Sequence, residues 1–543
     1  MKKHFLLLIS CALFSLSLAA QENYVSKVWT SDNGKGSYKN PVLYTDYSDP
    51  DVCRVGDDYY MTASSFNCIP GLPILHSKDL INWELIGHAV TTAQPPLDVY
   101  SVPRHGDGIW APAIRHHNDT FYIFYGDPDY GIYMTKSAKA EGPWSPLVLV
   151  KEGKGLIDPC PLWDDNGDVY LAFAYAGSRA GIKSLLLVCR LSADASTAIS
   201  EEKIVYDGHE IDETVEGAKF YKRNGYYYIF APAGGVTEGW QLALRSKNPF
   251  GPYERKMVLA QGKTSINGPH QGAWVDTKTG EDWFFHFQEQ PAYGRVLHLQ
   301  PMKWANDWPV MGEDKDGDGC GEPVLTYKKP NVGANFPIAT PVESDEFDGE
   351  KIGLQWQWHA NPRAWWAYIN RDKKQLRMFS APLPEGAKTL WSAGNLLMQK
   401  FPAPEFTVNT KLKFTPSKRV EGERAGLVVM GFSYANLAIE KSADGFVLSQ
   451  NECIDANNKN SVEKQNATVK LPSNEVYLRV KVEKNALCTF SYSLDGKKFE
   501  TLGSKYTAKS GRWIGAKAGF FCTRPKASND GGWIDVDYFR IEK

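Results

Sequence analysis

A pattern of polar turns followed by short aromatic strands recurs five times in the first 300 residues of the chain. Gly, Asn and Asp supply the turn, and the Tyr, Phe, Trp and β-branched residues that follow are typical of a half-buried strand. These turn-and-strand segments occupy residues 56–61, 118–124, 166–171, 224–230 and 280–285. A spacing of about 50 to 60 residues is that of propeller blades. Five such units, each with about four short strands, predict a five-bladed β-propeller.

The repeat ends near residue 330, and a different pattern follows. Residues 331–343 include two prolines and are expected to form a linker. Beyond them, segments such as 407–414 and 476–482 alternate apolar and polar residues between Gly, Asn and Asp turns, which predicts a β-sandwich. The chain is therefore expected to be all-β. The predicted propeller covers residues 21–330, and the predicted sandwich covers residues 344–543.

The amino terminus has the pattern of a secretory signal peptide, which we expect to occupy residues 1–20. Two lysines precede an apolar run over residues 5–18, and small residues follow it. The run is too short for a membrane span. Cys11 lies inside the run rather than at its end, which disfavours a lipoprotein anchor. The mature protein is expected to be exported, to the periplasm or beyond.

Composition excludes some partners and narrows the chemistry. A formal net charge of −2 provides no basic field for nucleic acid and no polybasic membrane signal. Aromatic residues make up 13% of the chain, which suits β-architecture and also stacking on sugar rings. The eight cysteines other than Cys11 lack CxxC spacing, so we expect buried thiols rather than a zinc or disulfide framework. Four tryptophans, at positions 356, 358, 365 and 366, are expected to pack in the core or between domains.

The repeat places a distinctive residue at the same position in each unit. About ten residues before each aromatic strand, or thirteen in the last unit, stand Asp49, Trp110, Asp158, Glu216 and His270. The first strand of a blade lines the central channel of a propeller, so these side chains are expected around one axis. A single Asp-Pro is usually a turn, and a single Glu is usually solvated. Three carboxylates converging on one cavity cost stability unless they are used, so together they indicate a functional site.

Two carboxyl groups of different protonation state are what glycoside hydrolysis requires. One gives a proton to the leaving oxygen, and the other activates water or attacks directly. A third negative group raises the pKa of the acid. A metal site is the competing interpretation, but the spacings of zinc motifs are missing, whereas calcium stays open. Residues 314–322 begin like a calcium loop, yet Leu325 stands where a bidentate Glu belongs, so we expect a tight acidic turn.

The chain resembles glycoside hydrolase family 43, most closely its β-xylosidase/α-L-arabinofuranosidase branch with a C-terminal concanavalin-like β-sandwich domain. The motifs that carry this resemblance are residues 48–52, 64–66, 110–112, 157–159, 215–217, 268–272 and 294–301, and in the second half 395–402 and 424–427. The resemblance implies an inverting exo-glycosidase. Its substrates would be terminal α-L-arabinofuranosyl or β-D-xylosyl units of hemicellulose fragments (arabinoxylan, xylan, xyloglucan), with a slight preference for the arabinofuranoside.

The resemblance also assigns roles to the three carboxylates. Asp49 would be the general base, Glu216 the general acid, and Asp158 the group that tunes the pKa of the acid and orients the sugar. In an inverting enzyme the base and acid are expected about 6.5 to 9.5 Å apart. The motif of related retaining families, Trp-Met-Asn-Asp-Pro, is not present at Asp49.

Four further residues are candidates for contact with substrate: Trp110, Phe66, Arg295 and His270. Phe66 equally suits the core, Arg295 the surface, and His270 either a structural hydrogen bond or a place beside an ion near the axis. No cofactor is required by this chemistry, and a structural calcium near the axis stays open. In similar xylosidases a loop of the second domain closes over the pocket. The alternatives are a non-catalytic carbohydrate-binding propeller and an endo-arabinanase, although endo-arabinanases generally lack the sandwich.

Overall fold

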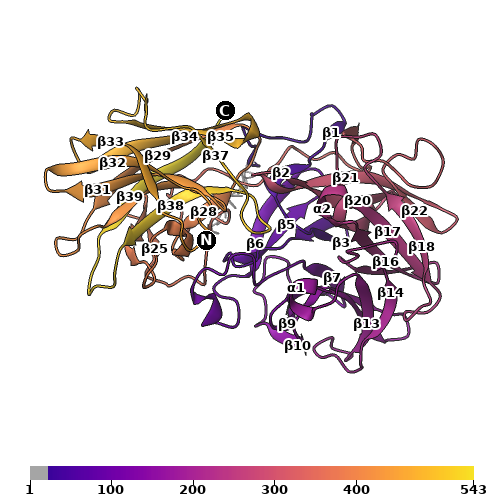
Figure 1. The fold of residues 1–543 in the computed structure, drawn as a ribbon. Helices are drawn as coiled ribbons and strands as arrows, with labels where there is room; N and C mark the ends of the chain where they lie inside the picture. Colours follow the sequence, from indigo (N-terminus) through magenta and orange to yellow (C-terminus); the bar gives the residue numbers. More distant parts are fainter. Residues whose placement is uncertain (1–22) are drawn as a thin grey trace, which may run out of the picture.

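The computed structural model describes residues 23–543, so the predicted signal peptide lies outside the described residues. As predicted, the described part is nearly all β, with a five-bladed propeller followed by a β-sandwich (Figure 1). No helix between residues 23 and 543 is long and apolar enough to cross a membrane. The few helical turns are α1 (Gly177–Ala180), α2 (Gly235–Glu238), η1 (Val99–Ser101), η2 (Leu390–Ser392) and η3 (Lys484–Ala486).

Four of the blades are antiparallel sheets of four consecutive strands. The first blade contains β3 (Asp51–Val55), β4 (Asp58–Thr62), β5 (Gly71–Ser77) and β6 (Trp83–Val90), and the second contains β7 (Ala113–His117), β8 (Thr120–Asp127), β9 (Gly131–Ser137) and β10 (Val148–Glu152). The third blade contains β11 (Leu156–Trp163), β12 (Val169–Tyr175), β13 (Leu185–Leu191) and β14 (Lys203–Asp207). The fourth blade contains β15 (Lys219–Arg223), β16 (Tyr226–Ala233), β17 (Trp240–Ser246) and β18 (Glu254–Leu259).

The fifth blade closes the ring with a strand from the start of the chain. It contains β19 (His270–Asp276), β20 (Asp282–Gln290), β21 (Gly294–Ala305) and β22 (Trp308–Met311), and β21 also pairs with β2 (Leu43–Asp46). A second pairing of distant segments joins β1 (Ser37–Lys39) to β23 (Thr326–Lys328). The first strands of the blades form the inner ring, since β3 contacts β7 and β19, and β11 contacts β7 and β15.

The turn residues seen in the sequence form the tight hairpins of the blades. Asn224 and Gly225 have φ values of 51° and 71°, and they join β15 to β16 as a two-residue turn. Asn118 and Asp119, with φ of 47° and 56°, do the same between β7 and β8. Positive φ at both central positions matches the twist of the flanking strands, and Asn, Asp and Gly adopt it most readily.

The propeller core lies between neighbouring blades. Trp83 of the first blade meets Phe285 of the fifth edge to face, with ring centroids 5.8 Å apart. Phe230 of the fourth blade lies 6.4 Å from Phe284 of the fifth. Such aromatic pairs stabilise a contact beyond the area that they bury, so the large side chains of the repeat hold adjacent blades together.

The second domain is a sandwich of two antiparallel sheets with an apolar core between them. One sheet has, in spatial order, β24 (Gln357–Trp358), β28 (Leu397–Lys400), β38 (Lys517–Arg524), β30 (Arg424–Met430), β31 (Tyr434–Ser442), β32 (Gly445–Cys453) and β33 (Lys464–Leu471), with β27 (Ala381–Pro382) parallel to β38. The other has β25 (Ala367–Asn370), β26 (Gln375–Phe379), β39 (Trp533–Glu542), β29 (Phe406–Thr415), β34 (Glu475–Glu483), β35 (Leu487–Ser493) and β36 (Glu500–Thr501), with β37 (Tyr506–Thr507) on β35.

Alternation along the sandwich strands fixes which face is buried. In β34 every second residue is apolar, and Val476, Leu478, Val480 and Val482 are each at most 1% exposed. Successive side chains of a strand point to opposite faces, so these four enter the core.

The tryptophan cluster and the cysteines follow the predictions with one exception. Trp356, Trp358 and Trp366 are buried, as expected, whereas Trp365 is 42% exposed. The eight cysteines between residues 23 and 543 are free thiols; six are buried, and Cys53 and Cys320 are partly exposed.

Backbone hydrogen bonds join the two domains. The amides of Trp358 and Ile69 each donate to the carbonyl of the other, at 2.6 and 3.1 Å. The amide of Ala516 donates to the carbonyl of Ala292 at 2.6 Å. Because peptide groups are rigid and directional, these bonds fix the sandwich at one side of the propeller, as Figure 1 shows.

Candidate active site

The five residues predicted to share a repeat position all lie at the starts of inner-ring strands. Asp49 precedes β3, Trp110 precedes β7, Asp158 is near the start of β11, Glu216 precedes β15 and His270 begins β19. Asp49 and Asp158 both influence the pKa of Glu216, so the three carboxyl groups share one electrostatic environment. The structure therefore gathers the residues that the repeat singled out.

Two of these positions have a left-handed backbone conformation. The φ values of Asp49 and Asp158 are 55° and 57°, a conformation that few non-glycine residues adopt and that clusters at functional sites. Gly217 has φ of 63°, and a Cβ there would lie 2.7 Å from Pro232. Its amide donates to Oδ2 of Asp158 at 2.6 Å. The glycine after Glu216 is thus needed to join the two acidic positions.

Asp49 is held in one orientation by three donors. The hydroxyls of Ser48 and Ser64 donate to its Oδ2, at 2.7 and 2.5 Å, and Nη1 of Arg295 lies 2.9 Å from its Oδ1. The side chain is 5% exposed. A carboxylate that only accepts hydrogen bonds from its surroundings is suited to take a proton from a bound water.

The other two carboxyl groups hold protons more tightly than usual. Burial raises the pKa of Glu216 to about 8; the charge of Asp158 adds to this, and Arg295 opposes it. Burial also raises the pKa of Asp158 to about 6. The hydrogen bond from the Gly217 amide lowers this pKa, and the charge of Asp49 raises it further. About a third of the Glu216 side chain remains exposed, at 35%, so its carboxyl group can reach a ligand. Near neutral pH the carboxyl group of Glu216 therefore keeps its proton.

His270 is a neutral group beside Glu216. Its Nε2 lies 3.9 Å from Oε1 of Glu216, and burial, with Arg295 adding, lowers its pKa to about 3. Both ring nitrogens are buried without a hydrogen bond to the described residues. Calcium takes six to eight oxygen ligands, whereas His270 offers a neutral nitrogen, so His270 itself does not supply the kind of ligand that calcium prefers.

The aromatic residues of the predicted site differ in what they expose. Trp110 is partly exposed, and its Nε1 donates to the carbonyl of Gly106 at 2.8 Å. Phe66 is 2% exposed and packs against Trp110, with centroids 6.4 Å apart, which leaves almost no surface for a sugar. Phe66 therefore supports Trp110, which corrects its prediction as a contact residue.

A tryptophan from the sandwich completes the site, and sequence patterns missed it. Trp513 is 39% exposed; its ring lies 6.1 Å from that of Trp110 and 5.6 Å from the guanidinium of Arg295. We call residues 511–516, which carry it, the closing loop. No repeat marks this loop in the sequence, although Trp513 has a φ of 64°, which is rare for a tryptophan.

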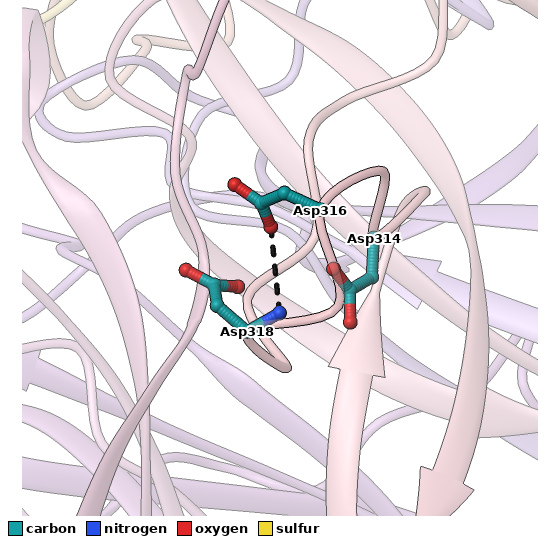
Figure 2. Close-up of side chains that lie close together, drawn as sticks. All are labelled: Asp314, Asp316 and Asp318. Carbon is teal, nitrogen blue, oxygen red and sulfur yellow. Dashed lines mark hydrogen bonds between the residues drawn. The ribbon is translucent and has the colours of Figure 1, made fainter.

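The acidic turn of residues 314–322 lies apart from this ring. Asp314, Asp316 and Asp318 are exposed, with carboxylate oxygens within 4.8 Å of one another (Figure 2). Asp314 accepts hydrogen bonds from the amides of Gly317 and Gly319, at 2.7 and 3.0 Å. Within residues 23–543 this is the single cluster of three or more such ligand groups, and its loop amides account for it as a turn, as predicted.

Comparison with known proteins places both domains. Residues 38–309 match glycosyl hydrolases family 43, and residues 344–542 match the Beta xylosidase C-terminal Concanavalin A-like domain. A protein of Xylanibacter ruminicola is 38% identical over 508 residues, which cover 92% of this chain and 88% of the relative.

Two further relatives carry different activities in their names. A Beta-xylosidase of Formosa agariphila is 31% identical over 561 residues, covering 94% of this chain and 91% of that protein. A Non-reducing end alpha-L-arabinofuranosidase of Bacteroides ovatus, BoGH43B, is 31% identical over 413 residues, covering 72% and 73%.

The crystal structure of the GH43 protein BlXynB from Bacillus licheniformis has the same fold. It superposes with a TM-score of 0.78 at 26% identity, over 93% of this chain and 99% of that one. The match therefore includes both the propeller and the sandwich, and the carboxylate ring lies within the segment matched to the family. The chain belongs to glycosyl hydrolase family 43, and it is a glycoside hydrolase.

Proposed function

We propose that this enzyme removes terminal β-D-xylosyl or α-L-arabinofuranosyl units from hemicellulose fragments, with inversion at the anomeric carbon. The observation that carries the proposal is the division of the carboxyl groups: Glu216 holds its proton near neutral pH, whereas three donors bind Asp49 as an acceptor. Where the environments of two titratable groups push their pKa values apart, the group with the higher pKa is the acid and the other is the base.

The reaction is a single displacement. Asp49 takes a proton from a water molecule while the water oxygen attacks the anomeric carbon, and Glu216 gives its proton to the glycosidic oxygen as the bond to that oxygen breaks. Burial, together with the charge of Asp158, raises the pKa of Glu216 and so keeps it protonated. Asp158 also accepts a hydrogen bond from the Gly217 amide. Exchange with solvent then returns the proton from Asp49 and restores that of Glu216. The two carboxyl groups and water supply every proton transfer, so we propose that no cofactor is needed.

The closing loop supports exo-action. Trp110 and Trp513 stand edge to face across the domain boundary beside Arg295, and we propose that they make the site a pocket rather than an open groove. A pocket admits the end of a chain and excludes its middle. Trp110, Trp513 and Arg295 would then contact the terminal sugar and the group that leaves.

The choice between the two sugars rests on the relatives. One is named for β-xylosidase activity and another for α-L-arabinofuranosidase activity. Both sugars present similar hydroxyls to the same carboxylates, so we propose that the pocket accepts both. We also propose export, because residues 1–20 have the pattern of a signal peptide; the mass of the mature protein should correspond to a chain that begins at residue 21.

The test is hydrolysis of aryl β-D-xyloside and aryl α-L-arabinofuranoside, side by side, together with product analysis on xylan and arabinan oligosaccharides. We expect turnover of at least one aryl glycoside and release of single sugars. Binding without turnover would favour a carbohydrate-binding propeller, and a ladder of internal fragments would favour an endo-acting enzyme. Either result would overturn the proposal.

A further inference from the structure

Asp46 lies where the two domains meet, and each of its three oxygen atoms accepts a hydrogen bond from one domain or the other. It is the last residue of β2 and is 3% exposed. Its Oδ1 accepts from the amide of Arg295 at 2.8 Å, and its Oδ2 accepts from the amide of Gly515 at 3.0 Å. Its carbonyl accepts from Nζ of Lys400 on β28. In Figure 1, β2 and β28 face each other across the domain boundary.

Backbone segments of both domains pack closely around the Asp46 carboxylate. A Cβ on Gly294 would lie 2.6 Å from Cγ of Asp46 and 2.5 Å from the amide nitrogen of Gly515. A Cβ on Gly515 would lie 2.6 Å from the carbonyl of Tyr293. Three backbone segments from two domains thus touch around one side chain, and any larger residue at either glycine would separate them.

Both donors to the Asp46 carboxylate belong to segments that reach the active site. The guanidinium of Arg295 contacts Oδ1 of Asp49 at 2.9 Å, and Gly515 stands two residues after Trp513 in the closing loop. The Trp513 ring lies 5.6 Å from that same guanidinium. A shift of Asp46 would therefore move the loop relative to the arginine that holds Asp49.

We propose that Asp46 is a positioning residue, which sets the closing loop of the sandwich against Arg295 and, through Arg295, against Asp49. The inference rests on the proposed function of the site, and Asp46 itself does not touch the sugar. Both neighbours of its carboxylate are N–H donors, so the position requires a group that only accepts. An asparagine would turn its amide nitrogen toward one of the two donors and break that hydrogen bond with almost no change in volume.

A double-mutant cycle tests the coupling. We expect Asp46→Asn to lower kcat/KM on the better aryl glycoside about tenfold in the otherwise wild-type enzyme, but less than twofold in a Trp513→Ala background, because the loop then has nothing left to position. Asp79→Asn is the matched control. Asp79 is a 2% exposed propeller aspartate that accepts from the amides of Ile81 and Asn82 and does not contact the site, so its substitution should leave kcat/KM within twofold in both backgrounds.

Two further measurements keep the test decisive. Lys400→Met removes the donor to the Asp46 carbonyl at similar volume. It should lower kcat/KM by less than Asp46→Asn does, and this loss should likewise shrink in the Trp513→Ala background. Hydrogen–deuterium exchange needs no turnover: peptides covering residues 511–516 should exchange at least tenfold faster in Asp46→Asn and unchanged in Asp79→Asn. Equal losses in both backgrounds, or unchanged exchange of the loop, would overturn the coupling and leave the proposed hydrolysis untouched.

Discussion

The sandwich and the propeller axis treat buried carboxylates in opposite ways. In the sandwich, Asp535 accepts two hydrogen bonds from the guanidinium of Arg377, at 2.7 and 2.9 Å, and Glu463 is paired with Arg424. At the axis, Glu216 is surrounded by two other carboxylates, and Arg295 only partly offsets their charge. The molecule therefore concentrates unfavourable charge where a protonated acid is needed, and neutralises it by pairing within the sandwich.

The raised pKa of Glu216 makes the stability of the folded protein depend on pH. Its ordinary pKa is 4.5, and burial and the neighbouring carboxylates raise it to about 8 in the folded protein. The folded state then binds the proton more tightly than the unfolded chain does. The contribution to stability is fully present below about pH 4.5 and is lost as the pH rises through about 8.

The largest difference between the two regions should appear in the catalytic rate. We expect Asp49→Ala to lower kcat/KM by about 10³- to 10⁴-fold on every substrate, because the base is lost. Glu216→Ala should cost as much on oligosaccharides but only about tenfold on aryl glycosides with activated leaving groups, which need little help from an acid. The control Asp535→Asn in the sandwich should leave rates within twofold. A similar loss of kcat/KM on oligosaccharides and on activated aryl glycosides would mean that Glu216 is not the general acid.

The pH dependence should locate the acid. Since Glu216 must be protonated in the free enzyme, kcat/KM of the wild type is expected to fall about tenfold per pH unit above about pH 8. In Glu216→Ala, measured on an activated aryl glycoside, this alkaline limb should disappear. An alkaline limb that persists unchanged in the variant would assign the titration to another group.

A smaller effect should follow from the contribution of the sandwich to the pocket. Trp513→Ala is expected to raise KM about tenfold with a lesser change in kcat, because a stacking surface beside the substrate is lost. Trp365→Ala removes another tryptophan of the same domain, which is 42% exposed and lies two residues before β25, and it should change neither constant. Equal effects of the two substitutions would mean that the closing loop does not contact the substrate.

The smallest expected effect is in thermal stability, and it should have opposite signs in the two regions. At pH 8.5, Glu216→Gln removes a partly buried negative charge beside two other carboxyl groups and should raise Tm by about 1–3 °C, whereas at pH 5, where Glu216 is protonated, it should change little. Asp535→Asn breaks a satisfied pair and should lower Tm by about 2–4 °C at both pH values. A fall in Tm for Glu216→Gln at pH 8.5 would contradict the account of the axis.

Sequence reasoning reached the parts of the molecule that local patterns encode. The Asn224-Gly225 turn and its counterparts identified the hairpins, and their spacing revealed the five blades. Because each blade repeats the same plan, position within the repeat also predicts that Asp49, Asp158 and Glu216 lie around one axis. A repeat of this kind carries three-dimensional information along the chain.

The contacts between domains could not be predicted in the same way. The hydrogen bond from Gly515 to Asp46 joins residues 469 positions apart, and neither lies in a repeat. Trp513 reaches the pocket only because the two domains dock at one angle, which no periodicity encodes. Phe66 shows the converse: its motif was visible, but its burial depends on packing against Trp110.

The anomeric configuration of the sugar at the moment of release distinguishes inversion from retention. Time-resolved proton NMR of the wild-type enzyme with the better aryl glycoside should show the anomer opposite to that of the substrate appearing first, followed by slow mutarotation. Inversion requires one displacement by a water that Asp49 activates. First release of the retained anomer would require a covalent intermediate, and the roles proposed for Asp49 and Glu216 would then be wrong.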